Sequence, residues 1–537
     1  MRSGMSGGLR RSGVLLSGRP YDAVVVGGGL AGCLIAGRLG LENVRTAVVE
    51  EGADIRQQPR WHREIACSLL AHRFARRAYE SHTNITSPQR THRSGEAAVP
   101  VMIPTPRVLG GGGVMGGRSW NLGDQNDWDG AAWSFRDELL PRVQKLENLE
   151  VSAPHRGRRG KFFISRPQAL SPFFRVFCEA MSKDTALISD FNKKEYHMKT
   201  GCGRAEIFVD YRSGIANTTL KSYLMDTIAL KRPIEVICNA RVFGISAKEG
   251  DKSTATGVSY VTSDGRTEHI EANTVVLCAG GIGTPRLLAA SQGTLAIDPK
   301  VGTNFWDTPQ VKIQFRTRMS LSHNCFMEPL VQMFLGLNVK YGRPLHALCS
   351  AYDDMICYWS STGQQKPNVK FIFQPFTMNN DGSIPEGVQH GVQIIAQLTQ
   401  PKSRGCIKAD GTIDPQYLMH PEDEQALCKA VARVKELTKM LPLSNVFIDM
   451  VGERFESAGI YGGGSLPVLD PRKFLVKNTT NLYVCDESVL HAPLMGDSLP
   501  YILALGEMFA DEFLHRSDVR QKSGTTMQGK NEARIIY

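Results

Sequence analysis

The chain has 537 residues, more than one hydrophobic core usually serves, so we expect two closely associated domains. Its 42% hydrophobic and 22% charged residues are typical of a globular protein, and no apolar run is long enough to span a bilayer. Twelve cysteines without regular spacing argue against a disulfide framework or a metal site and favour a reducing compartment.

The formal net charge is +10, and much of the excess lies in two stretches, Arg56 to Arg93 and His155 to Lys161. Two interpretations stay open: a solvated basic surface, or a contact surface for RNA or an acidic protein. The first twenty residues contain four arginines and no acid before Asp22, a composition that suits a mitochondrial transit peptide or a disordered basic tail. We therefore expect a mitochondrial protein, or otherwise a cytoplasmic one.

The first predicted unit is a strand, a glycine-rich turn and a helix. Val24 to Val26 are apolar and predict a short buried strand. Gly27, Gly29 and Gly32 follow as G-x-G-x-x-G, and Leu30 to Leu39 would form the helix. Such glycines allow a tight turn, a close approach of the backbone to a pyrophosphate, and close packing of the helix on the strand. The helix N-terminus would then face the phosphates.

A second apolar run ends at Glu50, where a carboxylate can accept hydrogen bonds from ribose hydroxyls. The complete unit of strand, turn, helix, strand and acid predicts a dinucleotide site, and a glycine-rich turn without a ligand is the alternative. The unit alone does not distinguish a flavin from a nicotinamide dinucleotide.

A second glycine-rich segment runs from Arg107 to Asn121 and reads R-V-L-G-G-G-G-V-M-G-G-R-S-W-N. Such backbone can approach a flat ligand closely, because no side chains intervene. An Asp-Trp pair begins at Asp127, and W-S-F-R-D-E-L-L-P begins at Trp133. Within it, Ser134 is a predicted helix cap with an acid three residues later.

The later segments predict a return to the first sheet, then an antiparallel sheet and a helix. Val275 to Leu277 are predicted to rejoin the nucleotide sheet, and Pro421 to Met440 to form a helix with acids in its first turn. The segments with strand patterns are Val311 to Phe315, Val369 to Phe373 and Val392 to Leu398.

Taken together, these motifs resemble the glucose–methanol–choline (GMC) oxidoreductase family, whose members bind FAD. The resemblance rests first on R-V-L-G-G at Arg107, the Asp-Trp pair and the W-S…L-P segment. It spans about residues 21 to 515, in the family's order and spacing. The other matching segments are Arg212 to Leu224, Pro233 to Val242, Val275 to Ser291, Val301 to Asp307, Ser403 to Leu418, Leu482 to Ser488 and Gly496 to Asp511.

The resemblance implies an α/β fold, with a Rossmann-like FAD-binding domain and a second α+β domain built on an antiparallel sheet. The implied division is a basic tail or transit peptide at 1–20, FAD-binding segments at 21–150, 211–310 and 456–515, a lid and substrate-domain segment at 151–210, the substrate domain at 311–455, and a tail at 516–537.

FAD is expected to be bound non-covalently. Members of the family that link FAD covalently use a histidine in the glycine-rich loop, and none lies between Arg107 and Trp120. The residues expected to contact FAD are Gly27, Gly29, Gly32, Glu50, Arg107, Gly110, Gly111, Val242, Asp486 and Ser498.

The catalytic positions depart from the family. Members oxidise alcohols: a hydride leaves carbon for the flavin, and a histidine in an H-P-x-G-T segment accepts the hydroxyl proton. In this chain Gly459 occupies the position of that histidine. The family's second histidine or asparagine falls on Asp497, or one residue on at Ser498.

Two residues are therefore candidate bases, Asp497 and His491, and Tyr461 or Tyr501 could also reach the flavin. Each has a structural alternative: Asp497 as a helix cap, His491 as an ordinary loop or core histidine, and the tyrosines as packing residues.

Two functions follow. The first is an FAD-binding oxidoreductase that acts on the CH–OH group of a small-molecule alcohol through an atypical active site. The second is a catalytically degenerate flavoprotein that serves as a structural or assembly component of a mitochondrial protein or ribonucleoprotein complex.

Overall fold

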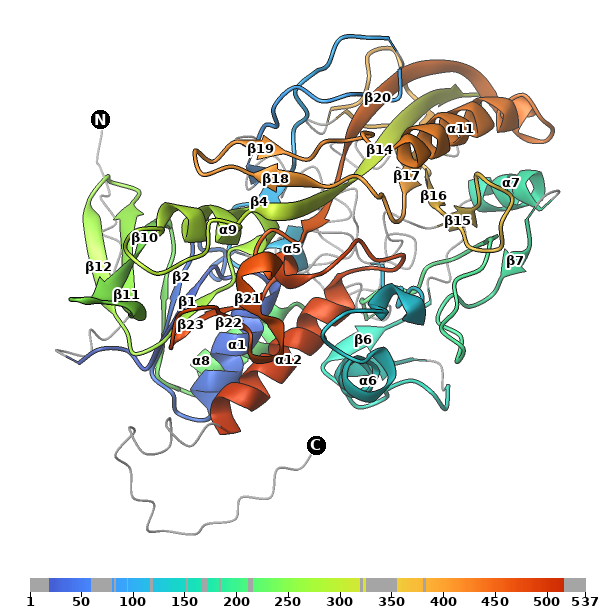
Figure 1. The fold of residues 1–537 in the computed structure, drawn as a ribbon. Helices are drawn as coiled ribbons and strands as arrows, with labels where there is room; N and C mark the ends of the chain where they lie inside the picture. Colours follow the sequence, from blue (N-terminus) through green and yellow to red (C-terminus); the bar gives the residue numbers. More distant parts are fainter. Residues whose placement is uncertain are drawn as a thin grey trace, which may run out of the picture.

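The structure is a computed structural model that describes residues 19–58, 80–81, 84–93, 95–115, 119–150, 153–166, 172–182, 185–210, 216–318, 322–324, 355–379 and 383–515. Both expected tails, the motif at Arg212 and most of the basic stretch from Arg56 to Arg93 lie outside these residues. The described chain forms two parts, each built on a large sheet (Figure 1).

The first part contains a seven-stranded sheet in the order β21-β22-β23-β13-β1-β2-β9. The five strands from β23 to β9 are parallel, and β21 and β22 add an antiparallel edge. Strand β1 is A-V-V-V and wholly buried, as expected of a parallel strand covered on both faces. The strands are β1 (Ala23–Val26), β2 (Thr46–Val49), β9 (Ile234–Ile237), β13 (Val275–Leu277), β21 (Leu469–Asp470), β22 (Leu475–Val476) and β23 (Leu482–Val484).

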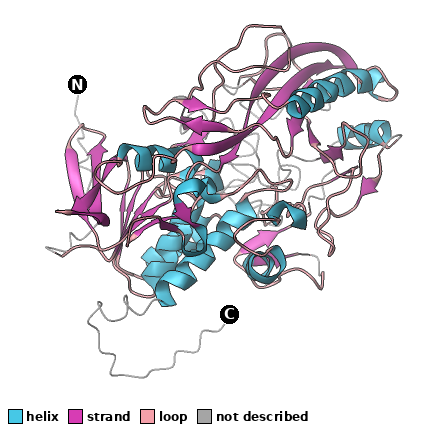
Figure 2. Ribbon diagram, viewed as in Figure 1, coloured by secondary structure: helices cyan, strands magenta, loops and turns pink. Residues whose placement is uncertain are grey.

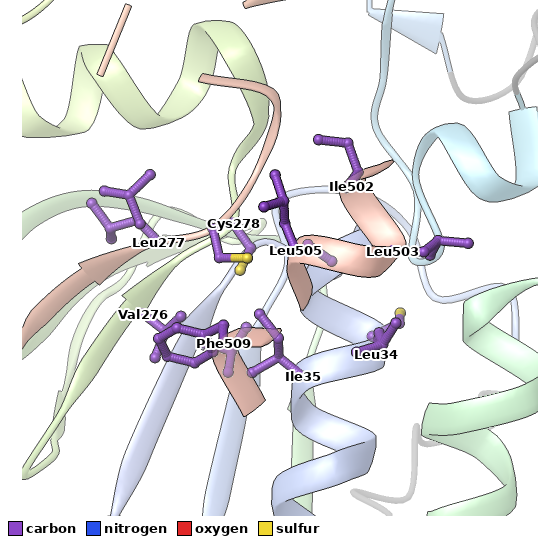
Figure 3. Packing of buried hydrophobic residues seen from close by; sticks show 14 of the residues in the cluster. Leu34, Ile35, Val276, Leu277, Cys278, Ile502, Leu503, Leu505 and Phe509 are labelled. Carbon is purple, nitrogen blue, oxygen red and sulfur yellow. The ribbon is translucent and has the colours of Figure 1, made fainter. Parts of the chain in front are cut away.

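The first and last described helices, α1 (Leu30–Leu41) and α12 (Leu499–His515), pack against each other beside this sheet. Figure 3 shows Leu34 and Ile35 of α1 among Leu503, Leu505 and Phe509 of α12 and apolar residues of β13. A Cβ added at Gly506 would stand 3.2 Å from Leu34, so the glycine permits this close helix–helix approach.

Smaller elements complete the first part and the connections. The three-stranded sheet of β10 (Ala240–Lys248), β11 (Asp251–Thr262) and β12 (Thr267–Glu271) is antiparallel. The remaining helices and short strands are β3 (Glu80–Ser81), β4 (Thr105–Pro106), α5 (Gly112–Met115), α6 (Leu140–Leu146), β5 (Glu147–Leu149), β6 (Phe162–Ile164), α8 (Asp226–Ala229) and α9 (Gly280–Ala290).

The second part is a nine-stranded sheet in the order β19-β18-β14-β17-β16-β15-β8-β7, with β20 paired along β14. The three predicted segments form β14, β17 and β16, and they are neighbours and antiparallel as expected. The strands are β7 (Leu187–Ile188), β8 (Gly201–Gly203), β14 (Thr303–Thr317), β15 (Met355–Trp359), β16 (Val369–Gln374), β17 (Gly391–Leu398), β18 (Gly405–Ile407), β19 (Ile413–Asp414) and β20 (Phe447–Gly462).

The two faces of this sheet differ in polarity. One face is apolar and packs against α11 (Pro421–Leu437) and α7 (Pro172–Met181). The other face carries long polar side chains, each less than a tenth exposed: Gln310, Lys312, Gln314, Lys370, Gln374, Gln393, Gln397 and Glu456. Because successive side chains of a strand alternate between faces, one short segment such as V-K-F-I-F-Q supplies both surfaces.

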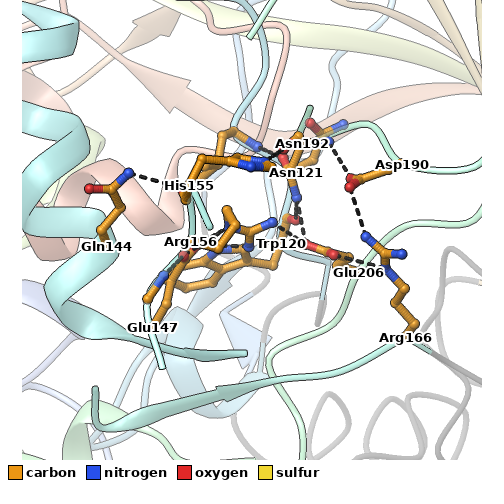
Figure 4. Close-up of polar contacts among 12 residues, drawn as sticks. Trp120, Asn121, Gln144, Glu147, His155, Arg156, Arg166, Asp190, Asn192 and Glu206 are labelled. Atoms are coloured by element: carbon orange, nitrogen blue, oxygen red, sulfur yellow. Dashed lines mark hydrogen bonds and ion pairs between the residues drawn. The ribbon is translucent and has the colours of Figure 1, made fainter. Parts of the chain in front are cut away.

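A buried ionic network joins the expected lid segment to the first part (Figure 4). Arg156, 1% exposed at its side chain, donates to Glu147 and Glu206 at 2.7 Å each. The Trp120 indole N–H also donates to Glu147, and the Asn192 amide donates to Glu206. The segment after the second glycine-rich run is therefore held by residues from 147 to 206.

The cysteine pattern was misleading at one pair. Cys202 of β8 and Cys357 of β15 are opposite each other in the antiparallel ladder, and their sulfurs form a disulfide. Their 155-residue separation hides the pairing from any spacing rule, so a pattern that argues against a disulfide framework did not reveal this single disulfide. The other described cysteines are free, and no group of metal-binding side chains occurs among the described residues.

The mixture of helices and strands over both parts confirms the predicted α/β fold class (Figure 2). The parallel sheet gives the Rossmann-like domain, and the antiparallel sheet gives the α+β domain. None of the described helices is long and apolar enough to cross a membrane.

Candidate functional site

The glycine turn after β1 has the geometry that its sequence predicts. Gly27 has φ +98°, which a residue with a side chain rarely adopts, and its N–H donates to Val49 of β2. A Cβ added at Gly32 would overlap the carbonyl oxygen of Gly27, so only glycine lets α1 start this close to β1. The turn therefore depends on two of the three glycines for purely steric reasons.

Glu50 stands directly after β2, at the predicted strand end. Its carboxylate accepts one hydrogen bond from Gly28 N and another from Gly52 N, each 2.7 Å long. Burial raises the pKa of Glu50 to about 7, and these two amides oppose the shift. The bonds fix the carboxylate beside the glycine turn, where each oxygen retains a lone pair for a further donor.

The second glycine-rich segment meets the first one. Gly110 N donates to Gly28 O at 2.7 Å, and a Cβ added at Gly111 would lie 2.9 Å from the Cα of Gly29. Arg107 binds Glu51 at 2.8 Å. Segments that are 80 residues apart in the chain therefore form one surface, which we call the cradle: the turns at Gly27–Gly32 and Gly110–Gly111 with Glu50.

The cradle fits the diphosphate of a dinucleotide. A Cβ added at Gly29 would meet no atom within 4 Å, so there is open space in front of α1. Gly29 is the N-cap of α1, and no side chain caps the helix. An uncapped helix start that faces open space is a ready anion site, because its amides point outward.

The other predicted cofactor residues lie in three further segments of the first part. Asp486, next to β23, accepts hydrogen bonds from Gly280 N and Thr284 and so fixes the turn after β13; burial raises its pKa. Val242 lies in β10 beyond the segment that bonds to Glu50 and Gly52. The carbonyl of Ser498 accepts hydrogen bonds from the first turn of α12.

Asp497 lies at a second contact between distant segments. Its carboxylate accepts a 2.8 Å hydrogen bond from Asn121 N, and its own N–H donates to Asn121 O. Close by, Asp127 accepts from Met495 N at 2.7 Å. We call this contact between residues 121–127 and 495–497 the junction.

The junction fixes the position of Asp497 and excludes its alternative role as a helix cap. The carboxylate bonds to Asn121 rather than to the first amides of α12, which begins at Leu499, so Asp497 is not a helix cap. A Cβ added at Gly123 would lie 2.5 Å from Gly496 N, and Gly123 has φ +68°. Glycine at this position lets the two segments come into contact.

Lys370 completes the surroundings of Asp497 and was not predicted. Its Nζ lies 4.0 Å from Oδ1 of Asp497, and its side chain is 7% exposed. On the next strand, the Tyr358 hydroxyl accepts from Asn121 and donates to Met495 O. The polar face of the nine-stranded sheet therefore turns towards the junction, at the point where Lys370 and Tyr358 stand.

His491 occupies a different environment from Asp497. Its ring lies 5.7 Å from the Trp128 ring, and its Nδ1 is buried without a hydrogen-bond partner among the described residues. Burial lowers the pKa of His491, so the neutral imidazole dominates at pH 7. A neutral imidazole can accept a proton, but the structure does not bring His491 and Asp497 into contact through any described interaction.

Gly459, expected at the position of the family's histidine, lies near the end of β20 and has φ +73°. A histidine in this backbone conformation would be strained. Tyr461 packs beside Gly281, and the hydroxyl of buried Tyr501 donates to Leu122 O. Both tyrosines thus have structural contacts.

Comparisons with known proteins identify a family and relatives over most of the chain. A family model described as GMC oxidoreductase matches residues 21–310. The oxygen-dependent choline dehydrogenase of Staphylococcus epidermidis is 25% identical over 551 residues, covering 91% of this chain and 92% of its own length. A similar enzyme from Staphylococcus aureus is also 25% identical and covers 92% of this chain and 93% of its own.

Solved structures share the fold. Pyridoxine 4-oxidase from Mesorbium loti superposes with a TM-score of 0.74 at 20% identity, covering 92% of this chain and 99% of that one. A variant of Aspergillus oryzae formate oxidase, studied for FAD modification, gives a TM-score of 0.78 at 18% identity, with 93% and 99% covered.

Proposed function

Because the chain belongs to the GMC oxidoreductase family, we propose that it binds FAD non-covalently and oxidises the CH–OH group of a small-molecule alcohol. The observation that carries the proposal is the combination of an open cradle with a carboxylate fixed at the junction. The cradle supplies the cofactor site, and Asp497 supplies a proton acceptor where the usual histidine is missing.

The cradle would hold FAD through its backbone. The open space at Gly29 and the start of α1 would take the pyrophosphate, and Glu50 would accept hydrogen bonds from ribose hydroxyls. Asp486 would keep the turn at Gly280 in place. Acid precipitation should release the flavin into solution, because no histidine for a covalent link lies in the glycine-rich segment.

FAD, when bound, supplies an acceptor for the hydride that leaves the alcohol carbon as the carbonyl forms. The chain must then accept the remaining hydroxyl proton, and we assign this role to the carboxylate of Asp497. Asn121 N orients that carboxylate, and the ammonium of Lys370 offsets its charge before the proton arrives. Protonation of Asp497 completes the balance: the alcohol loses one hydride and one proton.

The test is anaerobic reduction of the purified flavoprotein by a panel of alcohols, followed as loss of flavin absorbance. We expect Asp497→Asn to retain FAD and to slow reduction at least about 100-fold, the usual contribution of a general base. Asp449→Asn is the matched control, because Asp449 is an exposed carboxylate of β20 in a surface pair with Arg316.

The variants also separate the two candidate bases. If Asp497→Asn reduces its flavin at the wild-type rate while His491→Ala does not, the base is His491. If no alcohol reduces the wild-type flavin, the oxidoreductase function itself fails.

A second function is favoured by Gly459, because its φ of +73° would strain a histidine at this position. On this proposal the protein is a degenerate flavoprotein that acts as an assembly component in mitochondria, with its basic surface in contact with RNA or an acidic protein. Native protein should then run in a salt-sensitive complex in mitochondrial extract. A free monomer or homodimer at both low and high salt would contradict this second function.

A further inference from the structure

A pocket lies at the far end of the nine-stranded sheet from β14, away from the cradle. Its volume is about 570 Å³, within the range of small-molecule sites. It is formed by α7, by the edge strand β7 and by its neighbour β8. In Figure 1, α7 and β7 lie on the opposite side of the molecule from α1, so this pocket does not belong to the proposed FAD site.

The inner wall of the pocket is apolar. It is formed by Phe174, Cys178 and Ile188 together with Ala205. Leu187, at the edge strand, also lines the pocket and is 63% exposed, the largest exposure among the large apolar residues on the described surface. Leu187 therefore extends the apolar lining of the pocket towards solvent.

Three guanidinium groups line the same pocket. Arg166 is fixed by ion pairs with Asp190 at 2.7 Å and Glu206 at 3.1 Å. Arg204 lies 5.5 Å over the Phe174 ring, which orients its planar group. Arg175 is exposed on α7 and pairs with no acid among the described residues.

The pocket lining carries three guanidinium groups and one carboxylate, so its formal charge is positive. Glu179, one turn after Arg175 on α7, is the one carboxylate in the lining, and it forms no ion pair with any described residue. Asp190 and Glu206 are engaged in holding Arg166, and Glu206 is shared with buried Arg156. Fixed guanidinium groups are suited to carboxylates, which they can bind through two parallel hydrogen bonds.

We propose that this pocket binds a single-chain amphiphilic carboxylate, with its anionic head at Arg175 and Arg204 and its apolar tail over Leu187. Charge complementarity selects the head, and the apolar wall selects the tail. The pocket is separate from the proposed alcohol-oxidising site, so ligand binding there can be tested independently of the proposed function.

The test is isothermal titration of the full-length flavoprotein with decanoate at a concentration below micelle formation. Decanol, which has the same chain without the charge, should bind at least about ten-fold more weakly, as should acetate, which has the charge without the chain. Arg175→Glu should weaken decanoate binding at least about ten-fold, the effect of losing a charge-assisted contact and adding a repulsive charge. Leu187→Ser should weaken decanoate several-fold.

The control is Arg159→Glu, which makes the same charge change at an exposed arginine outside the pocket and should leave decanoate binding unchanged. The FAD content of each variant reports that the protein is intact. Equal binding of decanol and decanoate, or equal binding by wild type and Arg175→Glu, would overturn the proposal. So would binding to phosphatidylglycerol vesicles through Arg175 without binding of monomeric decanoate, because the ligand would then be a lipid surface.

Discussion

The cradle and the junction are both contacts between segments far apart in the sequence, yet they are built differently. The cradle relies mainly on backbone: Gly28 meets Gly110 by one amide–carbonyl bond, the space before Gly29 is open, and Glu50 adds a carboxylate. The junction relies on carboxylates bound to backbone amides, Asp497 to Asn121 N and Asp127 to Met495 N, and Lys370 lies beside it.

This difference shows where the chain could change during evolution. A site made of backbone depends on glycines and tolerates little, because any Cβ fills it. A site made of side chains can exchange one titratable group for another as long as the platform beneath it is retained. If Asp497 is the base, a carboxylate there in place of the family's histidine is an exchange of this kind.

The largest effect should come from a substitution inside the cradle. Gly32→Ala places a Cβ against the carbonyl oxygen of Gly27, which is backbone and cannot move aside. We expect loss of more than about 4 kcal/mol in the free energy of unfolding, seen as insoluble protein or a collapsed melting temperature. Gly29→Ala is the matched variant, because its Cβ meets nothing within 4 Å.

Gly29→Ala should therefore fold and melt normally without cofactor, yet bind FAD at least about ten-fold more weakly by fluorescence titration. If Gly29→Ala binds FAD as tightly as wild type, the open space at Gly29 is not the pyrophosphate site.

The support beneath the junction should be nearly as sensitive. Arg156→Met removes the cation that lies between Glu147 and Glu206 and leaves two buried carboxylates without it. We expect the free energy of unfolding, measured by urea denaturation, to fall by about 3–5 kcal/mol. Arg472→Ala, which breaks an exposed pair with Glu138, should cost less than about 1 kcal/mol. Similar costs for both variants would show that the buried network is not structural.

Asp127 predicts a pH dependence at the junction. Burial raises its folded-state pKa to about 7, against about 4 in the unfolded chain, so the folded state binds the proton more tightly. Its contribution to stability is full below about pH 4 and is lost as the pH rises to about 7. Asp127→Asn should remove up to about 4 kcal/mol of the change in unfolding free energy between low and high pH.

The measurement compares unfolding free energies of wild type and Asp127→Asn at pH 5 and pH 8. Other buried acids with raised pKa values, such as Glu50 and Asp307, affect both proteins alike and cancel in the difference. A difference that is constant over this range would contradict the assignment.

The smallest effect is expected at Lys370. Lys370→Met keeps much of the buried volume but removes the ammonium 4.0 Å from Asp497. If Asp497 is the base, the rate of flavin reduction should fall about 10- to 100-fold and its pH profile should shift, with FAD content unchanged. An unchanged pH profile would mean that Lys370 has only a structural role.

The cradle could be predicted from sequence because its information is local. Gly27, Gly29, Gly32 and Glu50 lie within 24 residues, and each has a steric or electrostatic reason at that spacing. The antiparallel sheet and α11 could be predicted for the same reason, since alternation and helical periodicity are properties of short segments.

The junction could be predicted only in part. A family resemblance indicated Asp497, but nothing adjacent in sequence indicates Lys370 or Asn121 as its partners. The one available signal was a lysine inside V-K-F-I-F-Q, which alternation assigns to the face opposite Phe371. Which group that face contacts depends on how the two sheets pack against each other, which a short segment does not determine. The pairing of Cys202 with Cys357 could not be predicted for the same reason.

The packing of α1 against α12 has a consequence for biosynthesis. Helix α1 leaves the ribosome early, but α12, which packs against it, is made about 460 residues later, and β23 follows its neighbour β13 by about 200 residues. At ordinary translation rates of 5–20 residues per second, the apolar side of α1 stays uncovered for on the order of 20–90 s, and the edge of β13 for on the order of 10–40 s. We therefore expect the nascent chain to depend on chaperones over that interval, and C-terminal truncations within α12 to accumulate as aggregates rather than as shorter folded proteins.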